Sequence, residues 1–229
     1  AAAVGSSAGI ASYQLRPQLL PAASAVGAPG GTGGGGAGNG GMGGAGADPW
    51  VTEALGDRLD ALSAAAAAAA GRRPTGLVVV ASLLENIPNM AGLCRTCESL
   101  GCEALVLPSR AVVASEAFKR QAVTSERWLP LHEVAPPDLP AYLAEARARG
   151  YWLVGVEQAA GSVALQAFTF PQRTLLLLGN EQSGVPQSLI GAMDACVEIP
   201  MLGVTRSLNA HVSGAMAVWQ YVQQQQQQR

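Results

Sequence analysis

Short apolar runs alternate with helical segments along the middle of the chain, and this alternation limits the possible folds. The run at 175–178 is four leucines followed by Gly-Asn, which is typical of a strand buried on both faces and ended by a turn. Strands separated by helices favour an α/β fold, with a mostly parallel sheet and helices on both faces. The predicted strands are 76–82, 103–107, 151–156, 174–179 and 195–200, and the predicted helices are 89–101, 115–123, 138–150, 186–195 and 207–222.

Low-complexity segments flank this region. Residues 1–47 are rich in Ala and Gly and are predicted to be a disordered linker, because such a segment buries too little apolar surface to fold. Residues 48–73 begin with Asp-Pro and contain an alanine run, so they are predicted to be helical. The folded domain is expected over 74–222 and a glutamine-rich tail over 223–229. Because the sequence begins at Ala1 rather than methionine, we expect a piece of a longer protein.

Composition bears on the possible partners and the compartment. The formal net charge of −2 argues neither for nor against a nucleic-acid partner. No apolar run approaches the ~20 residues that cross a bilayer, so no membrane partner is expected. Cys94 and Cys97 have the spacing of half a zinc site, but no second pair or histidine cluster completes it, and no metal is expected. Reduced cysteines would fit an intracellular compartment, either cytoplasm or nucleus, with an organelle left open.

Polar residues gather in three segments beside the predicted strands and helices. Each has a structural explanation when taken alone: Asn89 and Ser207 as helix caps, Glu181 as a cap of the helix that follows it, and Arg95 as a surface residue. The residues are Asn89 and Arg95, six positions apart at the start of helix 89–101; Asn180 and Glu181 after the leucine run; and Arg206, Ser207 and Asn209 at the start of the last helix.

Taken together, three segments resemble the signature motifs of a known superfamily. "NIPNMAGLCRTCESLG", "LLLLGNEQSGVP" and "IPMLGVTRSLNAHVSGA" are similar to the three motifs of the SPOUT superfamily, in its SpoU/TrmH branch of RNA 2′-O-ribose methyltransferases. The resemblance extends from about Gly76 to Tyr221 and is close to the eukaryotic tRNA (guanosine-2′-O)-methyltransferases. It implies a C-terminal trefoil knot, S-adenosyl-L-methionine as cofactor, tRNA as partner, and a homodimer with the active site at its interface.

The resemblance also implies roles for individual residues. The role of Arg95 stays open between a base that takes the hydroxyl proton and a phosphate clamp that stabilises the developing alkoxide. The implied catalytic residues are Asn89, Arg95, Glu181, Ser207 and Asn209, and the implied cofactor-binding residues are Val156, Glu157, Leu178, Gly179, Ile199, Met201, Ser207 and Leu208.

Two competing hypotheses belong to other classes. The first is a catalytically silent RNA-binding module that keeps the fold; intact Asn89, Arg95, Glu181 and Ser207 favour an active enzyme instead. The second is an ordinary doubly wound nucleotide-binding enzyme, which needs a glycine-rich loop after its first strand, and "VVVASLLENIPNM" has none. We therefore expect an enzyme that methylates a ribose 2′-hydroxyl of RNA, with a guanosine of tRNA as the target.

Overall fold

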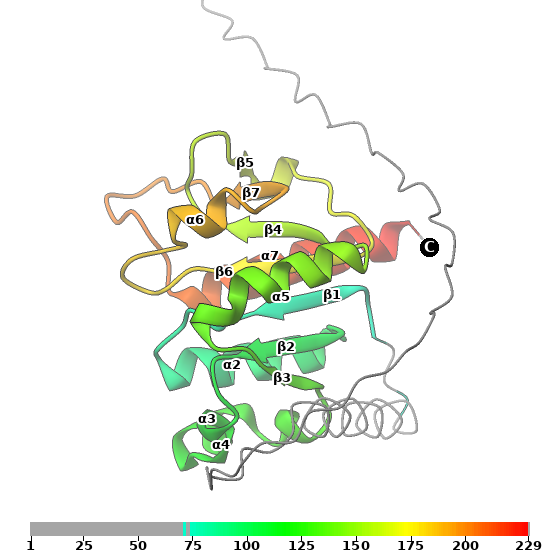
Figure 1. Cartoon of the computed structure of the whole chain (residues 1–229), viewed down its shortest axis with the longest axis vertical. Helices are drawn as coiled ribbons and strands as arrows, with labels where there is room; N and C mark the ends of the chain where they lie inside the picture. Colours follow the sequence, from blue (N-terminus) through cyan, green and yellow to red (C-terminus); the bar gives the residue numbers. More distant parts are fainter. Residues whose placement is uncertain (1–70, 72–73, 229) are drawn as a thin grey trace, which may run out of the picture. The chain divides into compact units, whose positions relative to one another are not determined.

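The computed structural model describes residue 71 and residues 74–228. The predicted linker at 1–47 and nearly all of the predicted helix at 48–73 lie outside the described residues. Seven strands form one sheet in the order β3-β2-β1-β6-β4-β7-β5, and every pair is parallel (Figure 1). This confirms the predicted α/β class. The strands are β1 Leu77–Val80, β2 Ala104–Leu107, β3 Leu131–Glu133, β4 Trp152–Val156, β5 Val163–Ala164, β6 Thr174–Leu178 and β7 Ala195–Glu198.

Helices cover both faces of the sheet. Figure 1 shows α5 in front of the sheet and α2 and α7 behind it, with all strands pointing the same way. The carboxyl ends of the strands therefore meet at one edge, where the loops that follow them gather. The helices are α2 Ile87–Ser99, α3 Ala111–Ala114, α4 Glu116–Ala122, α5 Leu139–Ala148, α6 Gln187–Ile190 and α7 Ala210–Gln227, with short 3-10 helices η1 Ser125–Arg127, η2 Pro136–Asp138 and η3 Leu165–Ala167.

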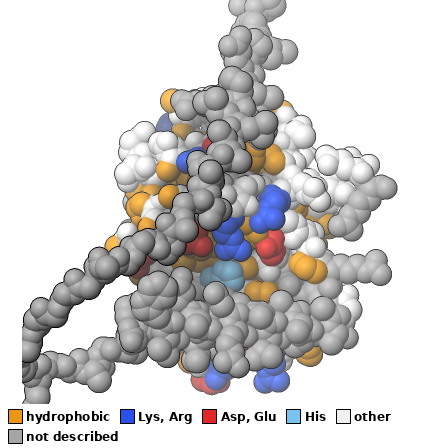
Figure 2. All heavy atoms as spheres, turned by 45° about the vertical axis from the view of Figure 1, so that its right-hand side comes forward, with side chains coloured by type: hydrophobic (Ala, Val, Ile, Leu, Met, Phe, Trp, Pro, Cys, Tyr) orange, Lys and Arg blue, Asp and Glu red, His pale blue; other side chains and the backbone are white. Residues whose placement is uncertain are grey.

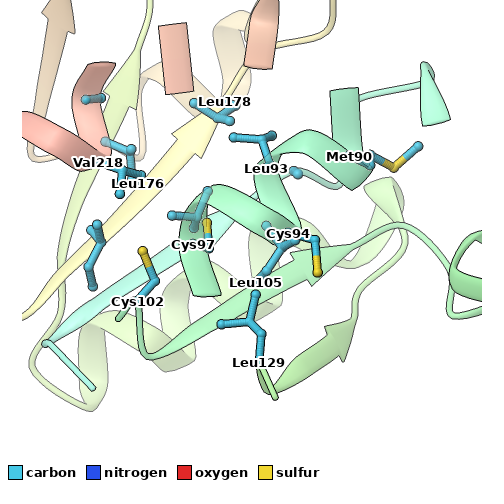
Figure 3. Packing of buried hydrophobic residues seen from close by; sticks show 14 of the residues in the cluster. Met90, Leu93, Cys94, Cys97, Cys102, Leu105, Leu129, Leu176, Leu178 and Val218 are labelled. Atoms are coloured by element: carbon cyan, nitrogen blue, oxygen red, sulfur yellow. The ribbon is translucent and has the colours of Figure 1, made fainter. Parts of the chain in front are cut away.

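Alternate residues of each strand supply two core layers, because successive side chains point to opposite faces of a sheet. In β6, Leu176 and Leu178 pack in the layer with α2, α4 and α7, whereas Leu175 and Leu177 pack in the layer with α5 and α6. Figure 3 shows the first layer, in which side chains of α2, the sheet and α7 meet. The leucine run is fully buried for this reason, as its continuous apolar pattern predicts.

The structure extends the last helix in a way that the sequence did not indicate. Helix α7 continues through most of the glutamine run at 223–229 and ends at Gln227. The side chain of Gln224 donates to the Phe168 carbonyl at 2.7 Å and accepts from the Phe170 N–H at 2.9 Å. These bonds pair backbone groups of the segment before β6, so part of the glutamine run fastens the helix to the core layer.

The remaining differences concern short elements. Strands β3 and β5 and helix α3 were not predicted, and none of them is fully buried. The helix predicted at 186–195 spans only Gln187–Ile190, because Asp194 turns back to accept from the Leu153 N–H at 2.8 Å. Arg147 also pairs with Asp194, at 2.9 Å. On the face drawn in Figure 2, some basic and acidic side chains lie next to one another.

Candidate functional site

A cavity of about 530 Å³ opens at the edge where the carboxyl ends of the strands meet. Its walls are the ends of β4, β6 and β7, the loops that follow them, and the first turns of α2 and α7. All eight residues predicted to bind the cofactor line it, together with four of the five predicted catalytic residues; Arg95 does not. The sequence-predicted residues around the cavity are Asn89, Val156, Glu157, Leu178, Gly179, Glu181, Ile199, Met201, Ser207, Leu208 and Asn209.

Glu181 joins the loop after β6 to the start of α2. Its carboxylate accepts from the Asn89 side-chain amide at 2.9 Å and from the backbone N–H groups of Glu85 and Asn86 at 3.1 and 3.2 Å. It therefore holds the segment that leads into α2, close to the N-terminus of the helix, where the helix dipole favours a negative charge. The alternative that Glu181 caps the helix after it in sequence, α6, is wrong. Burial alone would raise the pKa of Glu181, but these hydrogen bonds outweigh it and hold the pKa below its ordinary value.

Asn89 extends the same network to the start of α7. Its side chain is 6% exposed, and its Oδ1 accepts from the Asn209 amide at 2.9 Å. Asn89 lies inside α2, whose N-cap is Asn86, so Asn89 is not a helix cap. The cap of α7 is Asn209, whose Oδ1 accepts from the backbone N–H groups of His211 and Val212, in the first turn of the helix, at 2.9 and 3.3 Å. Ser207 was expected at that cap, and the structure corrects this by two residues.

The loop after β6 is a tight hairpin. Asn180 and Gly184 exchange two backbone hydrogen bonds of 3.0 Å. The side-chain Oδ1 of Asn180 also accepts from the backbone N–H groups of Gln182 and Ser183. A Cβ on Gly179 would lie 2.7 Å from the Gly184 carbonyl carbon, and Gly184 itself has φ +70°. The glycines are thus needed for the two limbs of the hairpin to approach each other.

Glu157 holds the other side of this hairpin. Its carboxylate accepts from the Val185 N–H at 2.7 Å and from the Gln158 N–H at 3.0 Å. Because Glu157 directly follows β4, these bonds tie the end of one strand to the loop of its neighbour. The sequence implied that Glu157 binds the cofactor and did not indicate that its side chain would support the hairpin.

Arg95 lies away from the cavity, on the exposed surface of α2. Six residues of helix separate it from Asn89, which is about 9 Å along the axis. It borders a second hollow of about 460 Å³, beside Thr96, Gln121 and His211. The His211 ring packs where a Cβ of residue 92 would stand, and its Nε2 is 3.1 Å from the Thr96 hydroxyl. Burial lowers the pKa of His211, which favours the neutral ring in this contact.

Several residues of the cavity escaped sequence reasoning. Gln158, Glu198 and Ser213 line it without belonging to the predicted set, although Gln158 lies two residues after β4 and Glu198 ends β7 at the relevant edge. That position was the signal available for them. Asn86 also lines the cavity, as the N-cap of α2.

Across residues 74–228, no helix has the length and apolarity that a bilayer span requires, and no three His, Cys, Asp or Glu side chains are grouped to hold a metal ion. The four cysteines are buried and form no disulfide. Burial raises the pKa of the Cys94 thiol to about 12, so it behaves as a small apolar side chain.

Residues 76–219 match the model of the SpoU rRNA Methylase family. The chain belongs to this family. A mouse protein named tRNA (guanosine(18)-2′-O)-methyltransferase TARBP1 is 47% identical over 177 residues, which is 77% of this chain and 11% of that protein. The tRNA (guanosine(18)-2′-O)-methyltransferase of Saccharomyces cerevisiae is 40% identical over 149 residues, 65% of this chain and 10% of that protein. This SpoU family chain thus spans about a tenth of the length of these two relatives.

Solved structures of this family share the fold. The SpoU methyltransferase AviRb of Streptomyces viridochromogenes, crystallised in complex with the cofactor AdoMet, superposes with a TM-score of 0.57 at 28% identity. The match covers 66% of this chain and 60% of the AviRb chain. The parallel sheet described above is therefore the sheet of a SpoU methyltransferase domain.

The network around Glu181 predicts how stability depends on pH. A carboxyl whose pKa is depressed in the folded state stabilises the fold at pH values above its unfolded pKa and loses that contribution as the pH falls through the folded pKa. We expect Glu181→Gln to lower the free energy of unfolding at pH 7, and the deficit to shrink below pH 4.5, the ordinary value for this carboxyl. Urea unfolding at a series of pH values measures this difference.

Glu116→Gln is the matched control, because the Glu116 side chain is 83% exposed on α4. Its effect on the free energy of unfolding should be small throughout the same pH range. A Glu181→Gln deficit that grew on acidification would contradict the assignment of the depressed pKa.

Proposed function

We propose that this SpoU domain transfers a methyl group from S-adenosyl-L-methionine to the ribose 2′-hydroxyl of a guanosine in tRNA. The observation that carries the proposal is the hydrogen-bonded series Glu181–Asn89–Asn209 at the wall of the strand-edge cavity. The names of the mouse and yeast relatives support tRNA and guanosine as the substrate. Because the chain matches only a tenth of those proteins, their complete activity is part of the proposal.

The strand-edge cavity fits the proposed cofactor. Its volume of about 530 Å³ lies in the range typical of small-molecule sites, roughly 300–1,000 Å³. Leu178, Gly179 and Met201 line it, and backbone amides and carbonyls of such residues would suit the edge of an adenine. Three carboxylates, Glu157, Glu181 and Glu198, also line it and suit a positively charged sulfonium. When bound there, S-adenosyl-L-methionine would supply the electrophilic methyl group.

The residues of this chain would act chiefly by positioning. Glu181, Asn89 and Asn209 fix the loop after β6, helix α2 and helix α7 relative to one another at the cavity, which reduces the entropy that a bimolecular displacement must lose. For Arg95 we favour the clamp role over the base, because a guanidinium stays protonated in proteins. Its charge and paired donors would hold an RNA phosphate and stabilise the developing alkoxide.

The position of Arg95 is the reason to include a second subunit in the proposal. Arg95 does not line the cavity of its own chain, so in a homodimer it would reach the cavity of the partner. An apolar face for this contact exists on α7. Val212, Met216 and Trp219 are 43%, 41% and 52% exposed on α7, at the spacing of one helical face, which we call the α7 stripe.

Two further features complete the proposal. The segment 199–209 leads from β7 to α7, which lies against α2 and β6, and the resemblance to SPOUT proteins implies that this path is a trefoil knot. Four cysteines without a disulfide support an intracellular place of action, in cytoplasm or nucleus.

Nucleoside mass spectrometry tests the function. We expect the chain, incubated with tRNA and S-adenosylmethionine carrying a deuterated methyl group, to produce labelled 2′-O-methylguanosine. Arg95→Ala should slow the reaction about 10²–10³-fold, as loss of one preorganised charge-stabilising group does. It should leave cofactor affinity unchanged, because the proposed contact of Arg95 is with an RNA phosphate and not with the cofactor.

Arg149→Ala serves as the control, since Arg149 is exposed at the end of α5 and pairs there with Glu145 at 3.9 Å. Tight tRNA binding without any labelled nucleoside at saturating cofactor would contradict the proposal and favour the silent RNA-binding module.

Light scattering tests the assembly. We expect the chain to have twice its monomer mass at micromolar concentration. Trp219→Glu should give a monomer, because a charge at the most exposed residue of the α7 stripe would be buried in the dimer. Ala117→Glu adds the same charge to the exposed surface of α4 and should leave the dimer intact. A monomeric wild-type chain with full methyltransferase activity would contradict the second-subunit role of Arg95.

A further inference from the structure

Arg206 is the cationic side chain at the strand-edge cavity. Among the described residues that line this cavity, it is the one that carries a positive charge. It lies in the exposed segment between β7 and α7, which extends past the carboxyl ends of the strands in Figure 1. Its backbone carbonyl accepts a 3.4 Å hydrogen bond from the Gln158 side chain, which connects this segment to the end of β4.

The carboxylates of the cavity are already committed to other partners. Glu157 accepts from the Val185 and Gln158 N–H groups, and Glu181 accepts from the start of α2. Glu198 accepts from the Ser162 hydroxyl at 2.6 Å. Within residues 74–228, no ion pair or side-chain hydrogen bond involves the Arg206 guanidinium. The guanidinium of Arg206 is therefore a positively charged group at the cavity whose hydrogen-bond donors are available to a ligand.

The charges of the cavity indicate which ligand group it takes. S-adenosyl-L-methionine has a sulfonium and an ammonium, which three carboxylates suit, and a carboxylate, which those same three groups repel. A cation beside the cavity removes this conflict, and the planar guanidinium binds a carboxylate through two parallel hydrogen bonds. We propose that Arg206 binds the carboxylate of the methionine part of S-adenosyl-L-methionine. The inference rests on the proposed function, whose cofactor it concerns.

A pair of ligands tests this inference with one substitution. Decarboxylated S-adenosylmethionine keeps the sulfonium and the ammonium and lacks only the carboxylate. In calorimetric titrations we expect Arg206→Gln to weaken S-adenosylmethionine about tenfold, the usual effect of losing a hydrogen bond to a charged group. It should leave the affinity for the decarboxylated compound unchanged. A merely structural role for Arg206 would weaken both ligands alike and would overturn the inference.

Two controls separate the possible outcomes. Arg149→Gln makes the same charge change at a distant exposed arginine and should leave both affinities unchanged. If Arg206→Gln weakened tRNA binding and kept the affinity for S-adenosylmethionine, Arg206 would bind an RNA phosphate and the inference would be wrong. If the wild-type chain bound neither adenosyl compound, the proposed function would fail as well; if it bound both and Arg206→Gln changed neither, only the inference would fail.

Discussion

The side-chain amide of Asn89 is the connection on which the site depends. It donates to Glu181 and accepts from Asn209, each at 2.9 Å, and is almost completely buried. Its partners lie 92 and 120 residues away in sequence, in the loop after β6 and at the start of α7. A buried amide left without partners is costly, so the loop, α2 and α7 are all constrained to the positions that satisfy it. The cavity is the space that these constrained segments enclose.

The same bonds also stabilise the two helices. Glu181 binds the backbone N–H groups of the segment that leads into α2, and Asn209 caps the start of α7. Each residue therefore holds the start of a helix and is also a wall of the cavity. Because the carboxylates of Glu181 and Glu157 accept hydrogen bonds from backbone N–H groups, they are held in place before any ligand binds. Such preorganisation is what a reaction limited by positioning requires.

The sequence was sufficient for the parts of the fold that depend on local pattern. The leucine run of β6 and the apolar run of β1 were predicted because continuous burial leaves a continuous apolar sequence. Strands β3 and β5 were missed because they are short and only half buried. The cap of α7 was placed at Ser207 rather than Asn209 because both residue types are good caps. Asn209 donates a hydrogen bond to Asn89, which holds its side chain at the start of α7. No local sequence pattern reveals this long-range contact. Similarly, the hydrogen bonds of Gln224 to the segment before β6 explain why a glutamine run continues a helix.

A double-mutant cycle on Glu181 and Asn209 tests most directly whether Asn89 couples the site. The two side chains contact Asn89 and not each other. From urea unfolding of Glu181→Ala, Asn209→Ala and the double variant, we expect a coupling of about 0.5–3 kcal/mol, as for residues in one hydrogen-bond network. The coupling should disappear when all variants carry Asn89→Ala. Additive effects in the presence of Asn89, within about 0.3–0.5 kcal/mol, would contradict the role of Asn89 as the connection between the three segments.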